Sequence, residues 1–341
     1  MLPKRILILG TFGPFGRRLA QSLARLPNAE CLLGAEPTDA AERLARELGV
    51  QAVAVNPRAG GSVRHALPGV FAVVNTCGPF LDPEYTVAEQ CAELGVHYID
   101  PGDTRDYVYG MQRLARAAER SGAQLVTAAS AAPTMSAALA DMLVPEFDRV
   151  REIHTCLTPG ARDQRELATV RAIINYADNP ARMKERGRWR EFYYWSQPQR
   201  VEFPAPLGRR RAYLCDRLDL DLFPKRYGAQ TVTFRMALPW RSFSLALAGV
   251  GWLGRRGVIT EPPGSLLTLV RLGARLLPTH RFAGGLRVEL HGEHRGEELM
   301  HTVFLIARDR HCAAISAAPV LALVKKWLAH GVATPGVTPC V

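Results

Sequence analysis

Short apolar runs alternate with amphipathic stretches over the first third of the chain. The apolar runs cover residues 5–9, 30–35, 51–55, 70–75, 97–100 and 123–127. Continuous apolar runs of this length are typical of strands buried on both faces of a parallel sheet. The stretches between them predict helices over residues 17–26, 38–48, 63–67, 84–94 and 104–121. Strands that alternate with helices in this way predict a doubly wound parallel sheet with strand order 3-2-1-4-5-6.

The pattern changes after Ser130. Residues 150–157 alternate between apolar and polar positions like a half-exposed strand. Residues 230–238, 286–293 and 298–307 predict antiparallel strands, with the last two joined as a hairpin near Gly296. We expect helices over residues 135–144, 166–176 and 317–330, and loop with short strands over residues 187–214. The predicted fold class is therefore α/β: a doubly wound parallel sheet plus an α+β domain with a mostly antiparallel sheet.

A glycine-rich turn joins the first predicted strand to the first predicted helix. It reads Gly10-Thr11-Phe12-Gly13-Pro14-Phe15-Gly16. Gly10 would permit the tight turn, Gly13 would let the backbone approach a pyrophosphate, and Gly16 would let the helix pack close to the sheet. Free N–H groups at the helix start would then face the phosphates. The turn thus predicts dinucleotide binding, and a structural turn without a ligand is the alternative.

Composition narrows the class of protein. The chain has 341 residues and a formal charge of +11, but its arginines are spread out and form no basic arm, so we expect no nucleic-acid partner. No apolar stretch reaches the length needed to span a bilayer, and the chain runs from its start directly into a strand, so we expect neither stable membrane insertion nor a signal peptide. The seven cysteines form no CxxC pair, which favours reduced thiols in the cytoplasm.

Two further motifs accompany the glycine turn. They are Val-Val-Asn-Thr-Cys-Gly-Pro-Phe over residues 73–80 and Gly-Val-His-Tyr-Ile-Asp over residues 95–100. With the glycine turn they resemble the saccharopine dehydrogenase/reductase-like family, over roughly residues 4–145 and more loosely at residues 169–195 and 313–337. The resemblance implies nicotinamide-dependent redox chemistry, typically on a C–N bond between an amino acid and a carbonyl partner. Some members of this family act as trans-acting enoyl reductases on lipid chains.

The resemblance also implies a domain organisation. Residues 1–130 would form a dinucleotide-binding Rossmann domain, residues 131–312 an α+β substrate and dimerisation domain, and residues 313–341 a C-terminal helix that returns to the Rossmann domain. A homodimer is expected. The apolar stretch 243–277 would supply helices that pack on the substrate domain or form a dimer contact. The alternative is an apolar tunnel or membrane-surface element for a lipid-like substrate.

Candidate cofactor-binding residues follow three of the predicted strands. The turn residues 10–16 would hold the pyrophosphate, and Asn75, Cys77, Gly78 and Pro79 would flank the nicotinamide ribose, although Asn75 could equally cap its own loop. At the end of the second predicted strand, similar proteins commonly show Gly-Arg-Asp, with the arginine on the 2′-phosphate of NADP. This chain has Gly-Ala-Glu-Pro over residues 34–37, so the arginine is absent and the carboxylate of Glu36 is present. Since a carboxylate repels a phosphate, NAD is slightly favoured over NADP. Arg17 or Arg58 could reach round and reverse that preference.

Candidate catalytic residues lie at the fifth predicted strand: His97, Tyr98 and Asp100. The unperturbed pKa of a histidine suits acid–base work near neutrality, but His97 shares a strand face with Ile99 and is as well explained as a structural histidine. Asp100, at the strand's carboxyl end, is the better candidate, with capping of the next turn as its alternative.

The histidines at positions 291, 294 and 301 invite a metal interpretation. Residues three apart on a strand point to opposite faces, so these side chains do not converge. We therefore expect no metal site.

These observations predict an NAD(P)-dependent oxidoreductase. It would transfer a hydride to or from a C=N or C–N bond of an amino-acid-like or secondary-metabolite small molecule. Two alternatives stay open: a trans-acting enoyl (C=C) reductase on an apolar or lipid-like substrate, and a non-catalytic nucleotide-binding scaffold or sensor.

Overall fold

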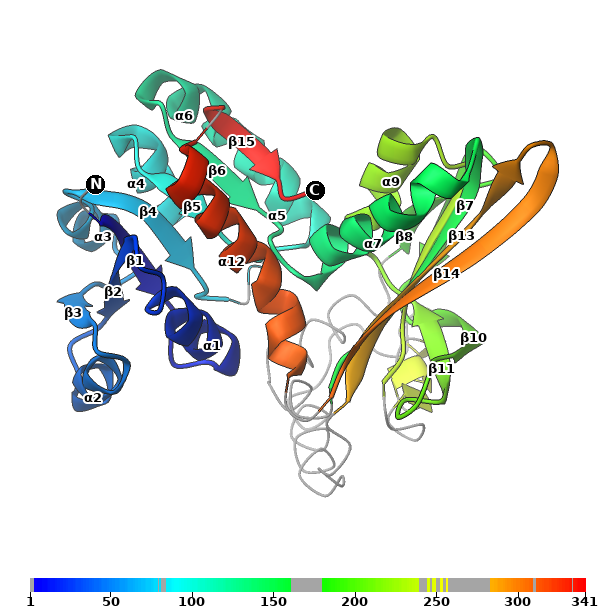
Figure 1. Ribbon diagram of the computed structural model, residues 1–341, viewed down its shortest axis with the longest axis horizontal. Coiled ribbons are helices and arrows are strands. Elements are labelled where there is room, and N and C mark those ends of the chain that lie inside the picture. The colour runs from blue at the N-terminus through cyan, green and yellow to red at the C-terminus, as the bar shows by residue number, and fades with distance from the viewer. Residues whose placement is uncertain are drawn as a thin grey trace. The chain divides into compact units, whose positions relative to one another are not determined.

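The computed structural model forms two compact units (Figure 1). It describes residues 3–160 except 79 and 81–83, residues 180–238, residues 244, 245, 247–249, 252, 253 and 256, and residues 283–341 except 309, 310 and 333. The first unit comprises Met1–Thr134 and Ala313–Val341, and the second comprises Met135–Cys312. The helix expected over residues 166–176, most of the apolar stretch 243–277, and Pro79 lie outside the described residues.

The first unit is built on a seven-stranded sheet in which every pair of neighbours is parallel. Its order is β15-β6-β5-β4-β1-β2-β3. The strands are β1 (Lys4–Leu9), β2 (Ala29–Ala35), β3 (Gln51–Ala54), β4 (Val70–Asn75), β5 (His97–Ile99), β6 (Gln124–Thr127) and β15 (Gly336–Pro339). The predicted order of the first six strands is confirmed, and β15 is an addition that the apolar pattern did not predict.

One face of this sheet is covered by α1 (Pro14–Leu23) and by α12 (Cys312–His330), which comes from the far end of the chain (Figure 1). Ile6 and Ile8 of β1 share a buried cluster with side chains of both helices. Trp327 of α12 is buried there, and its indole N–H donates to Gln124 Oε1 at 2.9 Å. The C-terminal segment is therefore part of the core of the first unit.

Among the described residues, five further helices belong to the first unit, and capping residues mark some of their ends. They are α2 (Asp39–Leu48), α3 (Gly60–Ala66), α4 (Thr86–Leu94), α5 (Arg105–Gly110) and α6 (Ala115–Ser121). Thr38 Oγ1 caps α2 by accepting from the Ala41 amide at 3.2 Å, and Gly95 ends α4 in the left-handed conformation.

The single helix predicted over residues 104–121 is wrong. The structure has α5, then a 3₁₀ turn (Met111–Leu114), then α6. The Tyr85 ring packs where Gly110 has no side chain, and its hydroxyl donates to the Tyr107 carbonyl at 2.7 Å. The Tyr107 carbonyl thus accepts from this hydroxyl as well as from the Met111 amide at the end of α5.

The second unit contains a six-stranded sheet of order β10-β11-β12-β7-β13-β14 and a separate hairpin, β8–β9. The strands are β7 (Arg149–Thr158), β8 (Pro180–Glu185), β9 (Arg188–Tyr193), β10 (Ser196–Glu202), β11 (Arg209–Leu214), β12 (Thr231–Met236), β13 (Gly284–His294) and β14 (Glu297–Ala307). The helices α7 (Ser136–Leu143) and α9 (Asp219–Tyr227) belong to the same unit. The predicted fold class, a parallel sheet plus a mostly antiparallel one, is confirmed.

Two details of the second unit differ from expectation. β12 pairs with β7 in parallel, not antiparallel, because several elements separate the two strands and the chain enters both from the same end. Helix α9 was missed, since Pro224 interrupts its sequence. Within the part of the chain that the structure describes, every helix is too short or too polar to cross a bilayer.

Candidate active site

The glycine turn packs tightly against the loop that follows β4. Gly10 has a φ of +80°, and a Cβ at this position would lie 2.5 Å from the carbonyl carbon of Thr76. A Cβ on Gly16 would overlap Gly10 O and Thr76 Oγ1. Thr76 in turn donates from both its amide and its hydroxyl to Leu9 O, at 2.9 and 2.6 Å. Glycine at positions 10 and 16 thus lets the loops after β1 and β4 meet.

Gly13 is different, because none of the described residues occupies the space beside it. A Cβ built on Gly13 meets no atom within 4 Å, and the backbone there is extended with a φ of −75°. Gly13 is the N-cap of α1, and the first turn of that helix carries no acidic residue. The neighbouring Thr11 Oγ1 is buried and has no hydrogen-bond partner among the described residues. An open helix N-terminus with an unused hydroxyl fits a dinucleotide diphosphate.

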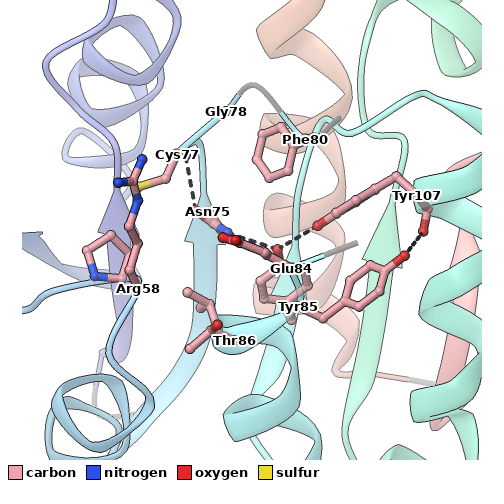
Figure 2. A pocket seen from close by; sticks show the side chains of 12 residues that line it. Arg58, Asn75, Cys77, Gly78, Phe80, Glu84, Tyr85, Thr86 and Tyr107 are labelled. Atoms are coloured by element: carbon pink, nitrogen blue, oxygen red, sulfur yellow. Dashed lines mark hydrogen bonds between the residues drawn. The ribbon is translucent and has the colours of Figure 1, made fainter. Parts of the chain in front are cut away.

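A pocket of about 450 Å³ lies beside the carboxyl end of β4 (Figure 2). Four of the predicted site residues line it: Asn75, Cys77, Gly78 and Tyr98. The rest of the lining comes from the segment after β3, the loop after β4, the start of α4, and α5. It consists of Pro57, Arg58, Phe80, Glu84, Tyr85, Thr86, Val87 and Tyr107. The residues of the glycine turn are not part of this lining.

A chain of hydrogen bonds leads from the pocket to a buried carboxyl group. Asn75 Nδ2 donates to the Tyr98 hydroxyl at 3.0 Å, and that hydroxyl lies 3.5 Å from the Tyr107 hydroxyl. Tyr107 donates to Asp100 Oδ2 at 2.9 Å. Figure 2 shows Asn75 and Tyr107 pointing toward each other across the pocket. The predicted catalytic residues Tyr98 and Asp100 are therefore linked, through a tyrosine that sequence reasoning had not singled out.

Asp100 has no exposed surface. Its Oδ1 accepts from Thr127 Oγ1 at 2.8 Å and from the Gly102 amide at 2.7 Å. Burial raises the pKa of Asp100 to about 6, although the hydrogen bonds from Thr127, Gly102 and Tyr107 favour the carboxylate and oppose that shift. A carboxyl group with such a pKa changes its protonation near neutral pH, as acid–base chemistry requires.

Both tyrosines of this hydrogen-bonded chain, Tyr98 and Tyr107, remain protonated. Burial, with the nearby Asp100 carboxylate as the next cause, raises the pKa of Tyr98 and of Tyr107 far above the ordinary range. Each hydroxyl therefore both donates and accepts. Such hydroxyls can pass a proton along a hydrogen-bonded chain without ever carrying a full charge themselves.

His97 lies apart from this chain, at the first residue of β5 and thus at the amino end of the strand. Its Nδ1 accepts from the Gln124 amide at 3.1 Å, and its ring lies near Phe71 and Trp327, with centroids 5.0 and 5.4 Å away. Burial, and then the Lys4 charge, lowers the pKa of His97. Ligands of open parallel sheets lie at the carboxyl ends of the strands, so the surroundings of His97 are those of a structural residue.

The other predicted site residues are spread over the same sheet edge. Glu36 is exposed and directly follows β2. Cys77 donates its amide to Asn75 Oδ1 at 3.0 Å, so Asn75 caps its own loop while its amide group also bonds Tyr98. Burial raises the pKa of the Cys77 thiol to about 11, which keeps it protonated.

Sequence reasoning missed Tyr85 and Tyr107 as site residues. Tyr107 stacks edge-on with Phe80 and lies beside Tyr85, with ring centroids 5.4 and 5.0 Å away. The only signal in the sequence is that an aromatic residue stands on the buried side of the helix after Asp100. Nothing in that spacing indicates a hydrogen bond back to Asp100.

The three histidines considered above for a metal site have separate surroundings. His291 Nε2 lies 3.1 Å from Glu289 Oε1, His294 Nδ1 lies 3.9 Å from Asp148 Oδ1, and His301 pairs with Glu146. Over the ranges that the structure describes, no three His, Cys, Asp or Glu side chains gather into a metal-binding group.

The fold and the turn together define a class of protein. A parallel sheet whose first strand leads through a glycine turn into a helix, followed by a second unit with a mostly antiparallel sheet, is the architecture of nucleotide-dependent dehydrogenases. Residues 6–140 match the family described as the saccharopine dehydrogenase NADP binding domain. Residues 6–140 are therefore similar to this NADP-binding domain, and the resemblance noted in the sequence is confirmed.

Solved structures share the fold at low sequence identity. The apo saccharopine dehydrogenase (L-Glu forming) of Saccharomyces cerevisiae is 13% identical, with a TM-score of 0.72 over 99% of this chain and 94% of that one. The DAP dehydrogenase of C. glutamicum, in complex with DAP, is 14% identical, with a TM-score of 0.52 over 100% and 93%. An engineered D-amino acid dehydrogenase bound to NADP⁺ is 14% identical, with a TM-score of 0.50 over 99% and 93%. A search of curated protein sequences found no match.

Proposed function

We propose that the protein is an NAD(P)-dependent oxidoreductase that acts on a C=N or C–N bond of an amino-acid-like small molecule. Two findings support this proposal. Residues 6–140 match an NADP-binding domain, and three proteins of the same fold are, by name, dehydrogenases of saccharopine, DAP and D-amino acids. The observation that carries it is the hydroxyl chain from the pocket to Asp100, because reduction of an imine needs a proton as well as a hydride.

The glycine turn would hold the cofactor. The open space at Gly13 and the α1 N-terminus would receive the diphosphate, and the loop over residues 75–80 would lie along the nicotinamide ribose. When bound, the nicotinamide supplies or accepts the hydride. The protein then has to orient the substrate, exclude water and supply the proton.

The proton would come from Asp100. In the direction of reduction, Tyr98 gives its hydroxyl proton to the substrate nitrogen, Tyr107 reprotonates Tyr98, and Asp100 reprotonates Tyr107 and becomes a carboxylate. Oxidation runs the same transfers in reverse and leaves Asp100 protonated. Because the pKa of Asp100 is about 6, we expect the rate of imine reduction to fall as the pH rises through that value.

Titration calorimetry with NADH and NADPH tests the proposal. We expect at least one of them to bind wild-type protein. In Gly13→Asp, the new carboxylate occupies the diphosphate space, so affinity should fall by at least about 100-fold. The fold should be retained, since no atom of the residues that the structure describes lies within 4 Å of the new Cβ. Asn28→Asp is the matched control: it adds the same charge to an exposed loop at the amino end of β2. Binding of neither cofactor to wild-type protein would overturn the proposal and favour a scaffold without cofactor.

The other expectations stay predictions. The enoyl reductase alternative depends on the apolar stretch 243–277, most of which lies outside the described residues. The homodimer and the cytoplasmic location are also predictions from the sequence.

A further inference from the structure

The β8–β9 hairpin of the second unit forms a separate two-stranded sheet with two different faces. Ala181 pairs with Phe192 and Met183 pairs with Arg190, so these four side chains share one face, the inner face. Met183 and Phe192 are buried, and β8 packs beside β12 and α9. The inner face therefore anchors the hairpin to the rest of the second unit.

The opposite face of the hairpin, here called the outer face, exposes two large aromatic rings. Trp189 is 48% exposed and Tyr193 is 44% exposed, although burial of rings of this size is favourable. The two residues stand four positions apart on β9, so their side chains leave the strand on the same side. The guanidinium carbon of Arg182 lies 5.8 Å from the centroid of the Trp189 ring, so the outer face presents a cation and an aromatic ring together.

The hairpin is also strongly cationic. Between Pro180 and Tyr193 the sequence has five cationic residues against two acidic ones. One of the acidic residues, Glu185, is paired with Arg190 at 3.1 Å. The hairpin turns at two residues with positive φ, which places an exposed arginine, Arg186, at its tip. The outer face and the tip together carry three cations, one carboxylate and the two rings: Arg182, Lys184, Arg186, Glu191, Trp189 and Tyr193.

We propose that the outer face of the β8–β9 hairpin binds the surface of an anionic lipid bilayer. Negatively charged headgroups attract arginine and lysine side chains, and each cation near the surface raises the affinity roughly fivefold. Tryptophan and tyrosine rings are enriched at the level of the headgroups, where one part of the ring is apolar and the other is hydrated. Single-stranded nucleic acid also combines aromatic and cationic contacts, but it is bound along a groove, whereas these side chains leave one face of a two-stranded sheet.

Such binding is peripheral, and it is separate from the proposed dehydrogenase chemistry. Co-sedimentation tests it with vesicles of phosphatidylcholine alone and vesicles of phosphatidylcholine and phosphatidylglycerol in equal parts. Wild-type protein should sediment with the anionic vesicles only, and its affinity should fall as salt is added. Lys184→Gln/Arg186→Gln should weaken this binding by at least about tenfold, because two cations are lost. Trp189→Ala keeps the charge and should weaken the binding by at least about fivefold, because the bilayer no longer covers the ring.

Arg116→Gln/Arg120→Gln is the matched control, since it removes two exposed arginines from α6 in the first unit. It should change vesicle affinity by less than about threefold, because these cations do not face the bilayer. An equal loss in this control would show that the total charge of the chain drives binding, and it would overturn the inference. So would wild-type protein that stays in solution with anionic vesicles, or that binds oligouridine more tightly than the vesicles. Each of these results leaves the proposed function standing, because NADH and NADPH binding is measured without lipid.

Discussion

Replacing Asp100 by Asn should change how the stability of the first unit depends on pH. Burial raises the pKa of Asp100 from 3.8 to about 6. Each unit of pKa shift corresponds to about 1.4 kcal/mol, so the buried carboxylate costs roughly 3 kcal/mol at neutral pH. The folded protein holds this proton more tightly than the unfolded chain does. The stabilisation is therefore complete below about pH 4 and is lost as the pH rises to about 6.

The asparagine of the Asp100→Asn variant cannot ionise, so it lacks this pH dependence. Its side-chain oxygen can still accept from Thr127 and the Gly102 amide, while the Tyr107 hydroxyl has to turn and accept from the new amide group. The free energy of unfolding of wild-type protein minus that of Asp100→Asn should consequently fall by about 3 kcal/mol between pH 4 and pH 7.

Hydrogen exchange in increasing urea measures this difference for one unit at a time. Peptides from β5 and β6 report the unfolding of the first unit separately from the second, which a global probe of a two-unit chain would mix. Asp106→Asn, an exposed position on the neighbouring α5, is the matched control for the loss of a carboxyl group. A difference that stays level within about 0.5 kcal/mol from pH 4 to pH 7, or that rises, would refute the reasoning.

Three further substitutions test the packing around the site. Gly10→Ala forces a Cβ onto the Thr76 backbone at a positive φ, so it should destabilise the first unit by roughly 2–4 kcal/mol in thermal unfolding; an unchanged midpoint would contradict the close contact of the two loops. Tyr107→Phe removes the donor to Asp100 Oδ2 and should lower the free energy of unfolding by about 1–3 kcal/mol. It should also raise the pKa of Asp100 further, so that the loss of stability with rising pH extends to higher pH. Trp327→Ala leaves a cavity between α12 and the sheet and should lower the free energy of unfolding by about 3–5 kcal/mol, measured by hydrogen exchange of β6 and β15. A loss no larger than that of an exposed substitution would show that α12 is not part of this core.

The sequence by itself was sufficient for the first six strands of the parallel sheet and for the glycine turn. The side chains of runs such as Ile6–Leu9 are buried on both faces of the sheet. A continuous apolar run in the sequence indicates such burial directly. The conformations at Gly10, Gly49, Gly95 and Gly122 are likewise local, because a positive φ is a property of one residue. Tyr98 and Asp100 could be predicted as site residues for a similarly local reason: they are polar residues at the end of a buried strand.

The tertiary structure alone decided which of these residues meet. It brought Tyr107 to Asp100, set His97 against Trp327 at the opposite end of β5, and placed β15 beside β6. It also engaged Arg17 with Glu47 and left Arg58 facing the pocket. Each of these outcomes depends on partners far apart in the chain. The pattern of apolar residues states how deeply a side chain is buried, and it carries no information about which distant atom lies next to it.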